Sequence, residues 1–220
     1  MKLHNVSWLL LMQLGLTLLA IAFIPGNLWK LVALLVLWLL TFRRFSLPEL
    51  ILFLVASVFF TIMNALSLQQ GIFAFRHPDV LGMPYYELVM WGFYLLHTRR
   101  MLDGRAPERI PWPVWLMALL YALAFAAISN QSLLLFVTAG LLLIALILFH
   151  EPQDLAYTGY MILLGAAIEY TGVYSGQWGY PGEPLGGVPL WFITLWGGVG
   201  LLLRRLVLPF VQRFERNAAI

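Results

Sequence analysis

The 220-residue sequence contains no cysteine, and only 10% of its residues are charged. The absence of cysteine excludes a disulfide framework and any thiolate metal site. A soluble domain carries about 25% charged residues, and a chain this short cannot hide such a deficit in a larger core, because too much of its surface faces solvent. Since 62% of the residues are hydrophobic, we expect the chain to lie in a lipid bilayer.

The motifs of common cofactor and metal sites are also missing. The sequence has no Gly-x-Gly-x-x-Gly, no P-loop and no His-Glu-x-x-His, and His150-Glu151 lacks the spacing of a two-histidine zinc site. With only three aspartates, Asp79, Asp103 and Asp154, the chain has no aspartate-rich pair for a magnesium-bound diphosphate, which disfavours a membrane prenyltransferase. The net charge of +3 comes from short basic clusters between apolar runs, a pattern that disfavours nucleic-acid binding. We expect no metal, no cofactor and no nucleic acid.

Long apolar runs dominate what is present. A helix needs about 20 residues, or somewhat fewer, to cross a bilayer. The runs that approach this length are Ser7–Ile24, Leu28–Phe42, Leu47–Leu66, Pro84–Leu102, Trp112–Ile128, Ser132–Phe149, Asp154–Tyr170 and Val188–Phe210. They predict an all-α polytopic membrane protein with eight transmembrane helices.

The basic residues predict an orientation, because cytoplasmic loops of membrane proteins are rich in lysine and arginine. With a cytoplasmic N-terminus, only Lys30 and Arg76 lie on the far side of the membrane. The basic residues on the near side are Lys2, Arg43, Arg44, Arg99, Arg100, Arg105, Arg109, Arg204, Arg205, Arg213 and Arg216. We therefore expect a protein of the cytoplasmic membrane with both termini in the cytoplasm. His97, near a cytoplasmic helix end, is expected to contact lipid headgroups.

A shift of the sequence by 105 residues, without a gap, aligns its two halves. The matched residues include glycines, prolines, aromatic residues and an Arg-Arg pair, which chance does not readily place in one register. The pairs are Glu49 with Asp154, Asn64 with Glu169, Gly71 with Gly176, Phe73 with Trp178, Phe75 with Tyr180, Gly82 with Gly187, Pro84 with Pro189, Tyr86 with Trp191, Trp91 with Trp196, and Arg99-Arg100 with Arg204-Arg205. We predict one membrane domain, 1–220, built from two parallel four-helix repeats, 1–105 and 106–220.

Glu87 and Glu169 are the strongest candidates for chemistry. An ionisable group at membrane depth is costly and usually faces a bundle interior or a cavity. Low dielectric there keeps a carboxyl group protonated and able to act as a general acid. The repeat breaks at both residues, since Glu87 is matched by Phe192 and Glu169 by Asn64. One unmatched acid in each half indicates a single shared site. The alternative is an interfacial carboxylate bonded to a neighbouring helix end.

The segments around these acids carry a family resemblance. They are Gly71-Ile-Phe-Ala-Phe75 and Gly82-Met-Pro-Tyr-Tyr-Glu87 in the first half, and Glu169-Tyr-Thr-Gly-Val-Tyr-Ser-Gly-Gln-Trp-Gly-Tyr180 and Gly187-Val-Pro-Leu190 in the second. They resemble integral-membrane carotenoid enzymes of the lycopene cyclase-domain type and the bacterioruberin-pathway carotenoid hydratases. The resemblance implies an enzyme that protonates a polyene double bond, leading to cyclisation or hydration of a hydrophobic isoprenoid or lipid.

The resemblance also implies a set of site residues. Glu169 and Glu87 would be the catalytic acid and base, and aromatic faces would stabilise a carbocation. The residues expected to contact the substrate are Asn64, Phe73, Tyr85, Tyr86, Tyr170, Tyr174, Trp178, Tyr180 and Trp191. The competing interpretation is a small membrane transporter or a lipid-binding scaffold without catalysis, since parallel repeats also occur in transporters. A wet path through the bundle would favour transport, and a closed apolar pocket would favour the enzyme.

Overall fold

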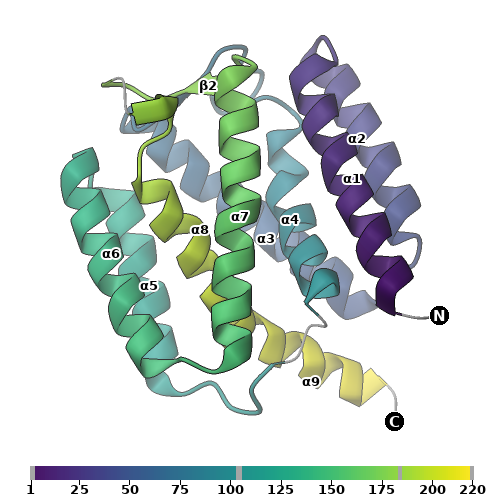
Figure 1. The fold of residues 1–220 in the computed structure, drawn as a ribbon, viewed down its shortest axis with the longest axis vertical. Helices are drawn as coiled ribbons and strands as arrows, with labels where there is room; N and C mark the ends of the chain where they lie inside the picture. The colour runs from purple at the N-terminus through teal and green to yellow at the C-terminus, as the bar shows by residue number, and fades with distance from the viewer. Residues whose placement is uncertain (1–2, 103–105, 183–184, 219–220) are drawn as a thin grey trace.

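The computed structural model describes residues 3–102, 106–182 and 185–218. This part of the chain is mostly helical (Figure 1). The helices are α1 (Leu3–Phe23), α2 (Asn27–Phe42), α3 (Leu47–Gln69), α4 (Glu87–Met101), α5 (Trp112–Ala127), α6 (Gln131–Leu148), α7 (Pro152–Tyr174), α8 (Trp191–Leu202) and α9 (Leu208–Ala218). A short 3-10 turn, Leu185–Gly187, precedes α8, and a π-helical turn, Leu203–Val207, joins α8 to α9.

Local sequence signals fix where the central helices begin. At the start of α3, the Ser46 hydroxyl accepts from the Glu49 backbone N–H (3.4 Å), and the Glu49 carboxylate accepts from the Ser46 backbone N–H (3.0 Å). At the start of α7, the Asp154 carboxylate accepts from the Glu151 backbone N–H (3.0 Å). Such bonds satisfy donors that a helix end leaves without partners. Proline occupies the first turn of both helices, where its missing N–H costs nothing.

Two closely packed helix pairs, α3 with α4 and α7 with α8, form the centre of the bundle. The α1–α2 hairpin packs on one flank, where α1 contacts α4 and α7, and the α5–α6 hairpin packs on the other, against α8 and α3 (Figure 1). Both central pairs approach closely through a glycine. A Cβ on Gly92 would lie 2.7 Å from the backbone oxygen of Phe53, and one on Gly200 would lie 2.4 Å from that of Tyr157.

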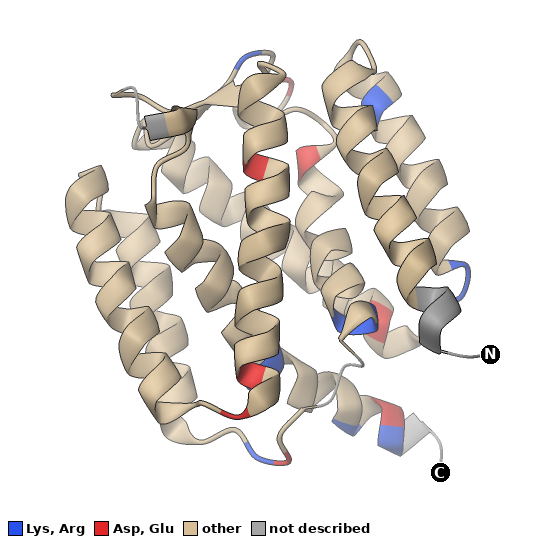
Figure 2. Cartoon of the chain, in the orientation of Figure 1, with Lys and Arg blue, Asp and Glu red and all other residues tan. Residues whose placement is uncertain are grey.

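Most arginines gather at the end of the bundle that holds both chain termini (Figure 2). Arg100 there makes two hydrogen bonds of 2.9 Å to the carboxylate of Glu49, which joins α4 to α3. Arg204 and Arg205 both pair with the fully buried Asp154, which joins the π-helical turn to α7. Each central helix pair is thus closed at this end by buried arginine–carboxylate contacts.

A two-stranded sheet closes the opposite end, where the sequence predicts only loops. Strands β1 (Ala74–Phe75) and β2 (Trp178–Gly179) pair antiparallel, with Ala74 opposite Gly179 and Phe75 opposite Trp178. Because β1 follows α3 and β2 follows α7, the sheet links the two central helix pairs.

The structure confirms a mostly helical protein of the membrane type, with the short sheet as the exception to the predicted all-α fold. Among the described residues, three helices are long and apolar enough to cross a membrane, and three shorter helices are apolar. The long ones are Leu47–Gln69, Gln131–Leu148 and Trp191–Arg216; the shorter ones are Ser7–Phe23, Asn27–Phe42 and Trp112–Ala127.

Each predicted apolar run overlaps a helix, but the last prediction ends too early. The predicted run ends at Phe210, whereas α9 continues to Ala218 and carries charged residues. Arg99 of α4 pairs with Glu215 of α9 and holds this extension against the bundle. Two basic residues used to predict the orientation, Lys2 and Arg105, lie outside the described residues.

Candidate functional site

Glu87 and Glu169 line the same cavity, which has a volume of about 50 Å³. Glu87 is the first residue of α4, and Glu169 lies in the last two turns of α7. We call this cavity the acidic chamber. Its lining residues are Asn64, Phe73, Phe75, Glu87, Trp91, Tyr94, Ile168, Glu169, Trp178, Tyr180, Trp191, Leu195 and Trp196.

Glu169 is enclosed by hydrogen-bond donors. One carboxylate oxygen accepts from the indole N–H of Trp178 (3.0 Å) and the hydroxyl of Tyr180 (2.6 Å), and the other accepts from the indole N–H of Trp196 (3.2 Å). Donors directed at a carboxylate favour its charged form and fix its position. Glu169 is therefore a structural centre that joins α7, α8 and the segment around β2.

Glu87 has fewer partners. The side-chain amide of Asn64 donates to one of its oxygens (2.9 Å), and the side chain of Trp91 is a second hydrogen-bonding partner. The residue is half-buried. A carboxylate can accept about four hydrogen bonds. Glu87 is therefore the acid of the chamber with acceptor capacity left for a further group.

Glycines of α7 let two tryptophans lie against the helix. A Cβ on Gly172 would lie 2.0 Å from the ring of Trp178, and one on Gly165 would lie 2.2 Å from the ring of Trp196. No larger residue leaves room for these indoles, since real Cβ contacts are never this short. The glycines of the second half thus place two of the three donors to Glu169.

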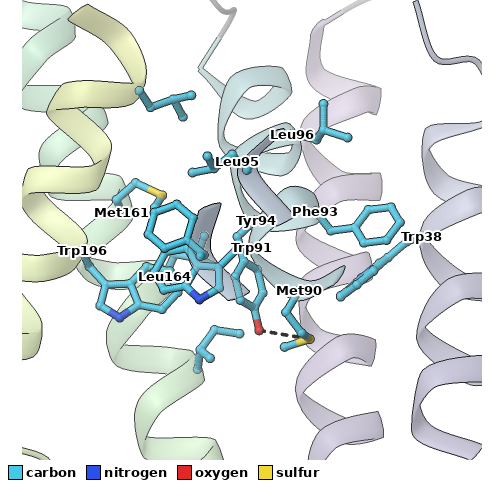
Figure 3. Packing of buried hydrophobic residues seen from close by; sticks show 14 of the residues in the cluster. Trp38, Met90, Trp91, Phe93, Tyr94, Leu95, Leu96, Met161, Leu164 and Trp196 are labelled. Carbon is cyan, nitrogen blue, oxygen red and sulfur yellow. Dashed lines mark hydrogen bonds between the residues drawn. The ribbon is translucent and has the colours of Figure 1, made fainter. Parts of the chain in front are cut away.

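Aromatic rings form most of the remaining wall. Trp91 stacks on Trp196 with ring centroids 4.5 Å apart, and Tyr94 packs beside both (Figure 3). The ring centroids of Phe73 and Tyr180 lie 6.0 Å apart. Stacked and edge-on rings at these distances stabilise one another beyond their buried area, so the wall of the chamber is rigid.

A second, larger cavity adjoins the acidic chamber. It has a volume of about 320 Å³, and we call it the apolar cleft. It is lined by residues of α3, the segment between α3 and β1, α4, α5, α8 and the π-helical turn: Leu52, Val55, Ala56, Phe59, Phe60, Met63, Asn64, Ser67, Ile72, Phe73, Trp91, Leu95, Ala118, Tyr121, Ala122, Phe125, Trp191, Leu195, Val199, Leu202, Leu203, Leu206 and Val207. The residues shared by both cavities are Asn64, Phe73, Trp91, Trp191 and Leu195, so the two are adjacent and have part of their walls in common.

Trp191 stands at this junction with a free hydrogen-bond donor. Its side chain is 4% exposed, and its indole N–H has no partner in the described part of the chain. A buried donor without a partner carries a free-energy cost. The junction is therefore a place where a hydrogen-bond acceptor on a ligand can be bound by the Trp191 N–H.

The structure brings together most of the predicted site residues and separates four others from them. Asn64, Glu87 and Glu169 line the chamber with the aromatic residues Phe73, Trp178, Tyr180 and Trp191. The side chains of Tyr85 and Tyr174 are 41% and 74% exposed, Tyr86 is buried beside Lys30, and Tyr170 packs on Tyr174 and Phe192.

Trp91 and Trp196 were missing from the predicted site, although the two residues match in the 105-residue register. A tryptophan at the same place in both halves was the signal that could have found them.

His97 is not a headgroup contact, so that expectation is wrong. The ring is buried, with Nδ1 2.7 Å from Gln13 Oε1 and Nε2 2.6 Å from the Tyr160 hydroxyl. It joins α4 to α1 and α7 inside the bundle, because α9 and the α1–α2 hairpin cover this end of α4.

No family model and no curated protein matches the sequence. Two solved structures match the fold. One is a mycobacterial Insig homologue, MvINS from Mycobacterium vanbaalenii, with a TM-score of 0.65 and 14% identity over 77% of this chain and 98% of that chain. The other is a cross-linked MvINS trimer, with a TM-score of 0.62 and 16% identity over 76% and 97% of the two chains.

These matches correct the predicted function. Both matched structures are of an Insig homologue and neither is of a carotenoid enzyme, so the prediction of a carotenoid cyclase or hydratase is wrong. The alternative of a membrane protein without catalysis agrees better with the comparison. The chain is an integral membrane protein with the fold of an Insig homologue.

Proposed function

We propose that this protein is a non-catalytic membrane scaffold that binds a neutral, hydroxyl-bearing lipid. The observation that carries the proposal is that the apolar cleft adjoins the acidic chamber and shares five lining residues with it. Together they offer one long apolar surface that ends in a few polar groups, the usual composition of a small-molecule site.

The apolar cleft suits the body of a lipid. Its volume of about 320 Å³ falls within the range of ligand pockets, roughly 300–1,000 Å³. Val55 and Phe59 of its rim are exposed on the membrane-facing side of α3. A lipid can therefore reach the cleft sideways from the bilayer, without crossing water.

The polar end of the cavity suits a hydroxyl group. The Trp191 N–H offers a donor and Glu87 offers an acceptor, and a hydroxyl both accepts and donates. A phosphate or carboxylate headgroup is disfavoured there, because the residues that line the chamber include two acids and no lysine, arginine or histidine to pair with an anion.

We also propose that the two halves, 1–105 and 106–220, are repeats of four transmembrane helices each, with both termini cytoplasmic. Three contacts support a two-fold relation at an offset of 105 residues. Ala74 lies opposite Gly179 in the sheet, and Trp91 stacks on Trp196. The third is a pair of matched ion pairs, Arg100 with Glu49 and Arg205 with Asp154.

Quenching of tryptophan fluorescence tests lipid binding. Bromine quenches an indole on contact, and Trp91 and Trp191 line the cleft. The probes are 9,10-dibromostearyl alcohol, its methyl ether and the corresponding fatty acid, added to purified protein in a neutral detergent. We expect saturable quenching by the alcohol at the lowest concentration. Equal quenching by all three probes would contradict the proposed polar end.

A cleft-filling variant distinguishes binding in the cleft from partition into detergent. Ala122→Phe places a ring in the cleft, and Ala139→Phe places the same ring on α6, away from the cleft. Saturable quenching should disappear in Ala122→Phe and persist in Ala139→Phe. Unchanged quenching in Ala122→Phe would remove the cleft as the binding site.

A further inference from the structure

A third cavity lies at the end of the bundle remote from the chain termini, apart from the acidic chamber. Its volume is about 500 Å³. Three segments that are distant in sequence meet around it: the turn between α1 and α2, the segment after β1, and the end of α7. Its lining residues are Ala22, Phe23, Ile24, Pro25, Gly26, Asn27, Lys30, Arg76, His77, Asp79, Ser175, Gly176 and Gln177.

Two cations line this cavity without a carboxylate partner. Lys30 is 4% exposed, and its ammonium group donates to the side-chain oxygen of Gln177. The Arg76 guanidinium lies beside Gly176, where a Cβ would be 2.9 Å from Nη1. Neither cation forms a salt bridge within the described ranges.

The one acid in the lining is already engaged. Asp79 Oδ2 accepts from the side-chain amide of Asn27 (2.8 Å) and from the backbone N–H of Tyr85 (3.0 Å). The cavity therefore presents a net positive charge. Four arginines at the opposite end, Arg99, Arg100, Arg204 and Arg205, differ in this respect, because carboxylates pair with them.

Within the described part of the chain, the partners of the Lys30 ammonium group are neutral: the side-chain oxygen of Gln177 and the ring of Tyr86, whose centroid lies 5.7 Å away. Lys30 lies in the first turn of α2, where the helix dipole disfavours a cation. The helix also begins at Gly26 without a side-chain cap, so its first N–H groups are open toward the same end. A buried cation normally requires a counter-charge, and an anion in the cavity supplies it.

We propose that this cavity binds a phosphate group, through Lys30 and Arg76. Two sources share this chemistry, the headgroup of an anionic phospholipid and free inorganic phosphate. The surroundings favour the lipid, because Phe23, Leu28 and Trp29 beside the cavity are exposed apolar side chains at an end of membrane helices. Acyl chains can lie along them while the phosphate enters the cavity.

Lipid-dependent thermal stability tests the proposal. Purified full-length protein in a neutral detergent is titrated with phosphatidylglycerol, with phosphatidylcholine of the same acyl chains, and with inorganic phosphate. Phosphatidylglycerol should raise the melting temperature saturably and phosphatidylcholine should not. Stabilisation by inorganic phosphate at a similar concentration would identify the free anion as the ligand. Absence of stabilisation by either phosphate source overturns the proposal.

Charge-removing variants locate the site. Lys30→Met and Arg76→Gln should each weaken the apparent affinity about tenfold or more, because each removes a charge-assisted hydrogen bond. Arg43→Gln removes the same charge from an exposed position at the opposite end and should leave the affinity unchanged. If Lys30→Met does not fold, Arg76→Gln alone tests the proposal, because Arg76 is exposed and its replacement does not disturb the core. Equal weakening by Arg43→Gln would show a general charge effect and overturn the site.

Discussion

Replacement of Gly165 by alanine tests the packing of the acidic chamber with a single methyl group. Its Cβ would lie 2.2, 2.4 and 2.5 Å from three ring atoms of Trp196, which is 1% exposed and stacks on Trp91. The indole cannot move without disturbing this stack and its bond to Glu169. Overpacking a core costs about 1–3 kcal/mol, and the higher helix propensity of alanine offsets up to about 1 kcal/mol. We expect a net loss of about 1–2 kcal/mol.

Gly159 of the same helix is the matched control, since nothing lies within 4 Å of a Cβ built there. Gly159→Ala should be neutral or more stable by up to about 1 kcal/mol. Circular dichroism during heating in neutral detergent measures both variants, and a loss of 1–2 kcal/mol corresponds to roughly 2–8 °C. Gly165→Ala should also weaken quenching by the brominated alcohol. A wild-type melting temperature for Gly165→Ala would refute the packing argument.

Three further predictions concern single side chains. Glu87→Leu should weaken binding of the brominated alcohol about tenfold, and Glu87→Gln, which keeps an acceptor, should weaken it less, as measured by quenching. Arg205→Met should lower stability by about 3–5 kcal/mol, because it removes a partner of the buried Asp154; heating in detergent checks this. The Arg204 guanidinium holds the pKa of Glu151 below its usual range. The pairing therefore stabilises the fold fully at a pH above the pKa that Glu151 has in the unfolded chain, about 4.3. This stabilisation is lost as the pH falls through the lower pKa that Glu151 has in the folded protein. The melting temperature should fall more steeply below pH 5 in the wild type than in Glu151→Gln.

The sequence predicts the helices well because apolar length is read directly from composition. It also predicts that Glu87 and Glu169 share a cavity, because each acid interrupts an otherwise matching register. It does not predict which loop aromatics face inward. Tyr85 lies between two buried residues just before α4 begins, and Tyr174 is the last residue of α7; the direction of each side chain depends on the backbone at a helix end, which no spacing fixes.

The error in the predicted function has a physical cause. The resemblance to carotenoid enzymes rests on glycines and aromatic residues of the two loop segments. In the structure Gly172 makes room for the ring of Trp178, and Trp178 in turn donates to Glu169. These residues are required to fold the chain back onto α7, whatever the site does. A glycine–aromatic pattern therefore predicts how a loop packs better than it predicts a reaction.

The proposed repeat explains why a single site forms at the centre of two similar halves. At the arginine-rich end both halves use an Arg–carboxylate pair, so these matched charges neutralise one another within the protein. At the centre the halves differ: Glu169 is satisfied by three donors from the protein, whereas Glu87 has two partners, Trp91 and Asn64, the residue that matches Glu169. Trp191 retains a buried donor beside them. The free acceptor and the free donor thus lie together at one point of the cavity, and a hydroxyl group there satisfies both.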